Sequence, residues 1–129
     1  MITLEPTADG SNTLYVPELN EHYHSVKGAL TESAHIFIQM GLNHAQAINP
    51  RVLEIGFGTG LNAFLTLLEA EKSQRAIHFT SIERFPLPEE IVRGLAYPET
   101  IAPQECEKFY ALHTASWNQE VKISPCFTL

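Results

Sequence analysis

The sequence predicts an α/β fold in which about three parallel strands are flanked by helices. A helical pattern, a short apolar strand, a second helical pattern and a second strand follow one another over residues 31–82. Glycines join the first strand to the helix after it, and another apolar run begins after Pro125. This alternation favours right-handed βαβ units and a parallel sheet.

The size and charge of the chain limit what it can do. With 129 residues it forms at most one domain, and its apolar fraction of 44% is ordinary for a folded protein. The net charge is -7, and its basic residues are scattered. Because an acidic chain repels phosphate backbones, a nucleic acid would need a local basic patch, which the sequence does not indicate.

The two cysteines, Cys106 and Cys126, stand alone without the CxxC spacing of a metal or redox site. We expect them to be reduced thiols of a cytoplasmic protein. The N-terminus lacks a basic region followed by an apolar run, so no signal peptide is expected. No stretch reaches the roughly 18 apolar residues of a membrane-spanning helix, and no membrane association is predicted.

The first 30 residues show little helical periodicity. Residues 13–16 and 22–25 are strand-like and could pair as a hairpin outside the parallel core. The alternative is a loosely packed arm that crosses the ligand site. We therefore divide the chain into an N-terminal arm or hairpin, residues 1–30, and a main unit, residues 31–129.

A helix is predicted from Thr31 to about Ile48. Thr31 or Ser33 can cap its first turn, and Asn49-Pro50 ends it. Its expected apolar face consists of residues at helical spacing, namely Ala34, Phe37, Ile38, Gly41, Leu42, Ala45 and Ile48.

The central feature is the segment from Arg51 to Asn62. Val52, Leu53 and Ile55 are typical of a buried strand, and a helix is predicted from Leu61 to about Lys72. Between them Gly56, Gly58 and Gly60 permit positive φ and leave no Cβ beside a ligand. Because the following helix directs its free N–H groups at this turn, we predict a small-molecule site at the carboxyl end of the strand.

The spacing of the glycines narrows the ligand. A dinucleotide-binding G-x-G-x-x-G motif would need glycine at position 61, where the chain has leucine. The observed pattern, Glu54-x-Gly56-x-Gly58-x-Gly60, resembles motif I of class I S-adenosylmethionine (SAM) methyltransferases. The helix N-terminus suits the carboxylate of SAM, and Glu83, which follows a strand at about 76–82, suits its ribose hydroxyls.

The remainder of the chain is predicted to contain two helices and the start of a strand. The helices span about Pro88–Leu95 and Pro103–Thr114, and the strand starts near Cys126. A doubly wound sheet normally has five or more strands, so we expect an incomplete fold with open sheet edges.

Two motifs together resemble the MnmC-like tRNA methyltransferase family. They are Gly-Phe-Gly-Thr-Gly-Leu-Asn at 56–62 and Ser-Ile-Glu-Arg-Phe-Pro-Leu at 81–87. The upstream segment with Tyr23 and Ser25 also resembles the segment with which the domain of that family begins. The resemblance implies an incomplete Rossmann-like class I methyltransferase fold. It also implies SAM-dependent methylation of the aminomethyl group on a tRNA wobble uridine. Some relatives carry a flavin-dependent oxidase domain, which implies an oxidase as a partner.

The resemblance implies cofactor contacts but no catalytic residue, because the family's reacting segment has no match here. We therefore expect a truncated methyltransferase that is inactive alone and binds SAM weakly at best. The candidate cofactor residues are Glu54, Gly56, Gly58, Gly60, Asn62, Glu83, Tyr23 and Ser25. Asn62 could instead cap the helix, and Glu54 could support the turn rather than contact a ligand. His22 and His24 share a strand face but lack a third ligand, so no metal site is predicted.

Two other functions remain open. One is a non-catalytic half-domain that dimerises through its open sheet edges or needs a partner. The other is a class I methyltransferase for a small molecule or a protein, which the acidic charge favours.

Overall fold

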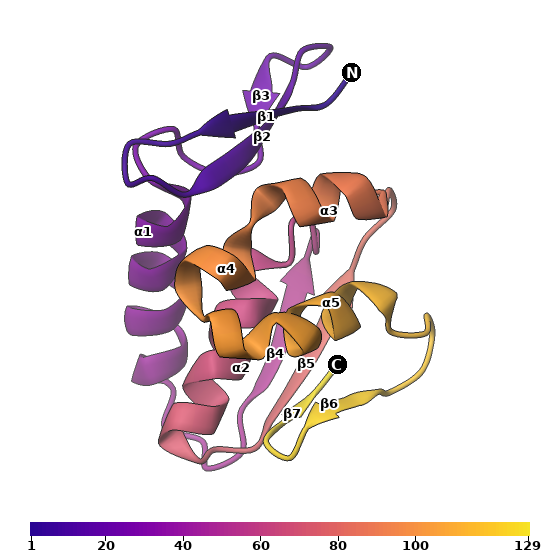
Figure 1. The fold of residues 1–129 in the computed structure, drawn as a ribbon. Helices are drawn as coiled ribbons and strands as arrows, with labels where there is room; N and C mark the ends of the chain where they lie inside the picture. Colours follow the sequence, from indigo (N-terminus) through magenta and orange to yellow (C-terminus); the bar gives the residue numbers. More distant parts are fainter.

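The computed structural model describes residues 1–129 and contains two sheets (Figure 1). The first is antiparallel with the order β1-β2-β3, and its strands are Thr3–Pro6, Asn12–Val16 and Glu21–His22. The second has the order β4-β5-β7-β6, and its strands are Arg51–Ile55, Ile77–Ile82, Phe127–Thr128 and Lys122–Ser124. Strands β4, β5 and β7 are mutually parallel, which confirms the predicted parallel sheet.

The N-terminal hairpin is present, and a strand that was not predicted extends it. Strands β2 and β3 pair antiparallel, with Tyr15 opposite His22, and β1 adds on the other side of β2. The predicted boundary at residue 30 lies within the first helix, α1 (Ala29–Ser33). The division of the chain at that point stays a prediction.

The helix predicted for residues 31–48 is shorter and less regular than expected. Helix α1 continues into a π-helical stretch, Ala34–Gln39, and a 3₁₀ turn follows at Leu42–His44. The prediction was wrong beyond residue 44, and Ile48 is exposed. A π turn contains more residues than an α turn, so it rotates the helix face: Ile38 stays buried while Phe37 becomes exposed.

The predicted cap of this helix was also wrong. Neither Thr31 nor Ser33 caps α1. Instead Asp9, in the loop between β1 and β2, accepts hydrogen bonds from the backbone N–H and the hydroxyl of Thr31 at 2.8 and 2.7 Å. This carboxylate satisfies an N-terminal donor of the helix and joins the first sheet to α1.

Helix α2, Leu61–Ser73, forms where the sequence predicts it. Phe64 and Leu67 are fully buried, and Phe64 meets Phe109 edge to face with 5.1 Å between ring centroids. Phe109 belongs to α5, so α2 and α5 pack together in front of the second sheet (Figure 1). The helices after β5 are α3, Glu89–Leu95, α4, Tyr97–Ile101, and α5, Cys106–Thr114, the last preceded by a 3₁₀ turn at Pro103–Glu105.

The helices cover one face of the second sheet and leave the other bare. Val52 and Phe79 are paired neighbours on the covered face. Leu53 and Ile55 are 66% and 75% exposed, and Ile82, the partner of Ile55, is 56% exposed. The prediction that Leu53 and Ile55 are buried was therefore wrong. No helix is long and apolar enough to cross a bilayer.

Candidate functional site

The three glycines after β4 form a tight turn that leads into α2. Gly56, Gly58 and Gly60 have φ values of 90°, 56° and 76°, a region that L side chains rarely adopt. The N–H of Gly56 donates to the carbonyl of Ile82 at 2.7 Å, so the turn begins as an extension of the β4–β5 pairing. The N–H of Phe64 donates to the carbonyl of Gly60 at 2.9 Å, so the turn ends as the first turn of α2.

Glu83, at the end of β5, is held against this turn. Its Oε1 accepts a hydrogen bond from the Gly58 N–H at 2.7 Å, and its Oε2 accepts one from the Arg84 N–H at 2.9 Å. The structure thus brings the predicted acidic residue and the glycines together. The Phe85 N–H also donates to Oε2, at 3.3 Å. Because an ionised carboxylate offers about four acceptor positions, Glu83 retains about one for a hydroxyl donor of a ligand.

Glu54 supports the turn from the covered face of the sheet. It accepts hydrogen bonds from the Ser81 hydroxyl at 2.8 Å and from Asn62 Nδ2 at 3.2 Å. Burial raises the pKa of Glu54, the two hydrogen bonds oppose this, and the nearby charge of Glu83 adds to it. These contacts join β4, β5 and the first turn of α2.

Asn62 does not cap α2, which excludes that alternative role. Its amide nitrogen bonds to Glu54, while its Oδ1 is buried without a hydrogen-bond partner. A buried acceptor without a partner costs free energy, so this atom is suited to a hydrogen-bond donor of a ligand.

Of the two candidate cofactor residues in the N-terminal segment, Tyr23 lies against the glycine turn and Ser25 does not line the groove beside it. The Tyr23 ring packs on the turn, since a Cβ added at Gly58 would lie 3.2 Å from Tyr23 Cδ2. Burial and the charge of Glu83 raise the pKa of Tyr23. The Ser25 hydroxyl instead accepts a hydrogen bond from the Lys27 N–H at 3.1 Å, and Ser25 does not line the groove described next.

Two cavities flank the turn. The first, of about 700 Å³, runs along β4 beside the π-helical stretch, and we call it the β4 groove; five of the predicted residues line it, namely Tyr23, Glu54, Gly56, Gly58 and Asn62. The second, of about 490 Å³, lies beside β5 and includes Glu83 in its lining. Phe57 borders both cavities. Gly60 lines neither, because the space where its side chain would be is occupied by His113.

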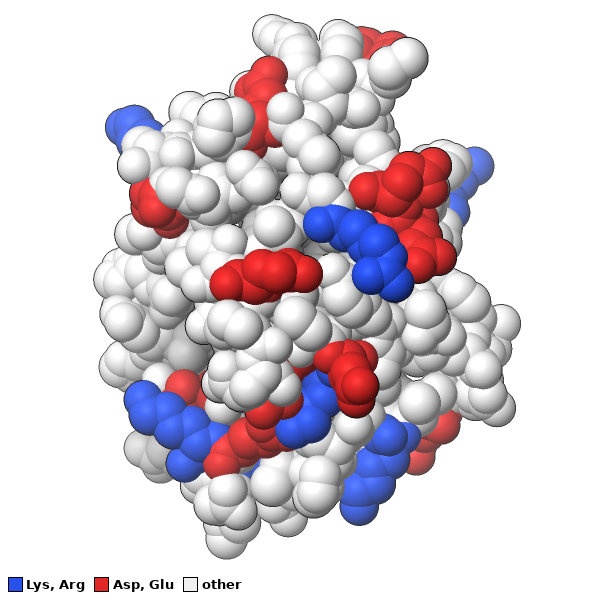
Figure 2. All heavy atoms as spheres, viewed as in Figure 1, with Lys and Arg blue, Asp and Glu red and all other residues white.

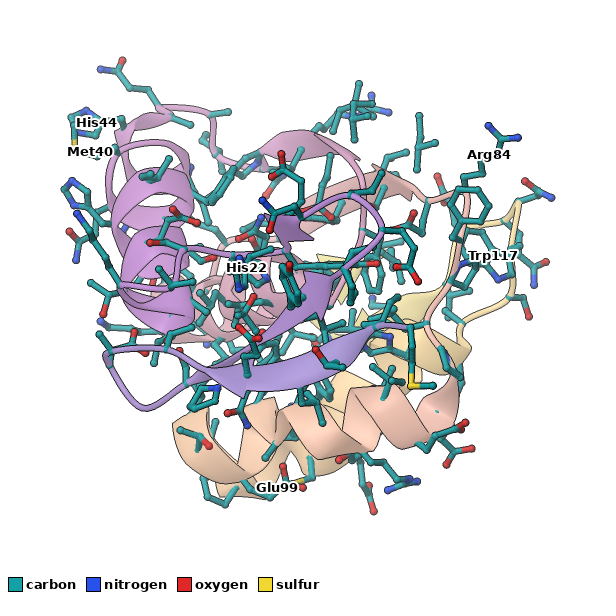
Figure 3. The ribbon with its side chains drawn as sticks, turned by 90° about the horizontal axis from the view of Figure 1, so that it is seen from above. His22, Met40, His44, Arg84, Glu99 and Trp117 are labelled. Atoms are coloured by element: carbon teal, nitrogen blue, oxygen red, sulfur yellow. The ribbon has the colours of Figure 1, made fainter.

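Other polar and aromatic groups surround the second cavity. Trp117 lines it and is more than half exposed, and Figure 3 shows Trp117 and Arg84 at the same edge of the molecule.

On the face drawn in Figure 2, basic and acidic side chains are interspersed. That face offers no continuous basic patch for a phosphate backbone.

Sequence reasoning missed a partly buried cluster behind the turn, formed by Thr59, His24 and His113. Thr59 is 1% exposed and contacts both imidazoles. No local signal pointed to it, since the two histidines lie far apart in the sequence and each fits an ordinary strand or helix pattern. His22 forms a hydrogen bond with Glu5, whereas His24 forms one with Thr59, so these two histidines have different partners. No group of three side chains that could bind a metal ion occurs.

The geometry defines the ligand that the site can accept. The N-terminus of α2 and the turn favour an anionic group, the carboxylate of Glu83 favours hydroxyls, and Asn62 Oδ1 favours a donor. An amino acid joined to a nucleoside carries all three kinds of group.

Comparison with known proteins identifies relatives. The chain is 42% identical over 88 residues to the tRNA 5-methylaminomethyl-2-thiouridine biosynthesis bifunctional protein MnmC of Delftia acidovorans, covering 63% of this chain and 14% of that protein. To the protein of the same name in Polaromonas naphthalenivorans it is 38% identical over 104 residues, covering 74% of this chain and 16% of that protein. No protein-family model matches the chain.

A solved structure, MNMC2 of Aquifex aeolicus, shares the fold with a TM-score of 0.59 and 31% sequence identity. The match covers 76% of this chain and 37% of that one. The chain thus spans about one seventh of the curated relatives that it matches. Sequence identity and common fold together show that this chain is homologous to a part of the MnmC proteins.

Proposed function

We propose that this chain binds SAM at the glycine turn, as part of a methyltransferase unit that modifies the wobble uridine of tRNA. One observation carries the proposal. The three glycines between β4 and α2 have positive φ values, and the N–H of Gly58 donates a hydrogen bond to the carboxylate of Glu83. The MnmC relatives support the tRNA substrate through their names.

The residues present fit SAM. The N-terminus of α2 would attract the methionine carboxylate, and Asn62 Oδ1 would accept a hydrogen bond from the ammonium group. Glu83 would accept a hydrogen bond from a ribose hydroxyl. The β4 groove, which Asn62 lines, has a volume of about 700 Å³, and the cavity beside β5, which Glu83 lines, has a volume of about 490 Å³. Both volumes are within the roughly 300–1,000 Å³ of small-molecule sites.

When bound, SAM supplies an electrophilic methyl group for an amine of the substrate. The contribution of this chain is orientation: Glu83 and Asn62 would hold the two ends of the cofactor, and the glycines would allow close approach. No residue of this chain is assigned a proton-transfer role.

The proposal also includes a partner enzyme and a cellular location for this chain. A flavin-dependent oxidase would supply the amine substrate, in line with the word bifunctional in the relatives' names. A cytoplasmic location stays a prediction, and the two free thiols are compatible with it.

Titration calorimetry with SAM tests the proposal, with a matched pair of glycine variants. Gly56 and Gly10 have φ values of 90° and 86°, and a Cβ at either would meet nothing within 4 Å. Gly56→Ala and Gly10→Ala therefore introduce similar backbone strain, but only Gly56 lines the β4 groove. We expect Gly56→Ala to weaken SAM binding about tenfold or more while Gly10→Ala leaves the affinity unchanged. Equal losses in both variants, or no SAM binding by the parent chain, would contradict the proposal.

A second function is supported by the bare face of the sheet. Exposed Leu53, Ile55 and Ile82 favour a non-catalytic half-domain that pairs with a second copy or another chain. Sedimentation analysis distinguishes the two proposals when combined with calorimetry. A stable dimer that binds no SAM would favour the second function.

A further inference from the structure

The glycine turn encloses a polar residue that the proposed cofactor does not need to touch. Thr59 lies between Gly58 and Gly60 and is 1% exposed. Its hydroxyl is 2.7 Å from His24 Nε2, and its carbonyl accepts a hydrogen bond from His113 Nε2–H at 3.0 Å. Both polar groups of a residue at the centre of the turn are thus engaged by histidines.

The two histidines reach Thr59 from opposite sides. His24 follows β3 and lines the β4 groove, and its backbone N–H is fixed by a 2.9 Å hydrogen bond to the Thr13 hydroxyl of β2. His113 lies in the last turn of α5 and lines the cavity beside β5. The turn is therefore held between the N-terminal sheet and the C-terminal helix.

His113 also determines the shape of the turn. A Cβ at Gly60 would lie 2.7 Å from His113 Nε2, so the imidazole fills the space directly behind that glycine. The ring is fixed between Phe57 and Phe109, at centroid distances of 5.1 and 4.9 Å. Because the Thr59 carbonyl can only accept, His113 must carry its proton on Nε2.

We propose that His113 and His24 are positioning residues that hold Thr59 from two sides and so keep the glycine turn in the form that receives SAM. The inference rests on the proposed SAM site but concerns the turn itself, which can be measured without cofactor. Neither histidine transfers a proton in the reaction; each acts through Thr59.

The surroundings of each imidazole determine the effect of pH. Burial lowers the pKa of His113 to about 4, and its hydrogen bond to the Thr59 carbonyl opposes the shift. Burial likewise lowers the pKa of His24, and the carboxylate of Glu32 on α1 opposes the shift. Glu83 and Glu120 line the same cavity as His113, and Phe57 and Phe109 contact its ring.

The sign of the pH effect follows. We call the turn closed when both histidines contact Thr59. In this form the pKa of each imidazole is below its ordinary value of 6.5, so each binds a proton more weakly than a free imidazole does. The closed turn is therefore fully favoured above that pKa and loses stability as the pH falls from 6.5 toward 4.

Amide hydrogen exchange of residues 55–62 in the full chain, without SAM, tests the proposal. His113→Phe keeps a ring but removes the donor to Thr59, and His113→Gln retains an N–H at a similar position. We expect about tenfold faster exchange in His113→Phe, and recovery of most protection in His113→Gln. His44→Phe, at an exposed histidine, is the matched control and leaves exchange in this segment unchanged.

The pH profile and the SAM affinity complete the test. After correction for intrinsic exchange rates, the parent chain should lose protection of residues 55–62 between about pH 6.5 and pH 5, and His113→Gln should lose less. SAM affinity should fall by a similar factor in His113→Phe. If His113→Phe exchanges like His44→Phe, or if His113→Gln behaves like His113→Phe, the positioning role is overturned. A parent chain that shows the exchange pattern but binds no SAM would overturn the proposed function alone.

Discussion

The two faces of the β4–β5 pair have similar apolar residues and different surroundings. On the covered face, Ile77 and Phe79 are 3% and 2% exposed. Figure 1 shows α2 and α5 on the covered side of the sheet. On the bare face, Leu53, Ile55 and Ile82 are mostly exposed. A parallel sheet normally has both faces covered, so the bare face is a surface that another polypeptide segment could cover.

The difference shows that burial is not a property of the strand sequence alone. Both βα crossovers, through α2 and through α3–α5, return on the same side of the sheet (Figure 1). Because each crossover is right-handed and the strand order proceeds from β4 through β5 to β7, their helices must lie on one face.

The largest effect is expected for Phe79→Ala on the covered face. Phe79 packs against Phe127 at a centroid distance of 5.7 Å, which links β5 to β7. Removing the ring should lower the free energy of unfolding by about 3–5 kcal/mol, as measured by urea denaturation. A loss below about 1 kcal/mol would mean that this face is less tightly packed than the structure shows.

A matched pair compares the same substitution on the two faces. Ile77→Ala should cost about 2–5 kcal/mol because it leaves a cavity in the core. Ile55→Ala, at an exposed site of the same sheet, should cost less than about 0.5 kcal/mol. Equal costs by chemical denaturation at low protein concentration would show that the bare face is covered in solution.

Glu54 is an ionisable residue on the covered face of the sheet, where burial makes ionisation of its carboxyl group unfavourable. Burial raises its pKa above the ordinary value of 4.5, so its contribution to stability is greatest below pH 4.5 and is lost as the pH rises through the folded-state pKa. Compared with Glu54→Gln, the parent chain should therefore become relatively less stable between about pH 4 and pH 7.

The control for this comparison is Glu90→Gln, at an exposed position of α3. Thermal unfolding of all three proteins across the pH range gives the measurement. A parallel pH dependence in the parent chain and Glu54→Gln would argue against a buried, raised carboxyl.

The smallest effect on the folded monomer is expected for Ile82→Lys on the bare face. The side chain is exposed, so the free energy of unfolding should change by less than about 0.5 kcal/mol. Self-association should decrease, because a charge interrupts the apolar surface formed with Ile55. Sedimentation velocity checks this; unchanged association would exclude this face from the contact.

Local patterns sufficed for the region that carries the candidate site. The start of α2 at Leu61 and strand β5 agree with the sequence analysis, and Glu83, which was predicted as a ribose contact, lies against the glycine turn. The π-helical stretch, strands β1 and β6, and the exposure of Leu53 and Ile55 were not anticipated. Each of these depends on which segment packs nearby rather than on the local sequence.

The sequence by itself determined the turn, because backbone conformation is a local property. Three glycines at alternate positions, an acidic residue before them and an apolar helix after them allow few structures. Only the tertiary structure decided which face of β4 is covered and that His24 and His113 meet at Thr59. Periodicity distinguishes the two faces of a strand or helix, but contacts between distant segments arise only when the crossovers have folded and packed.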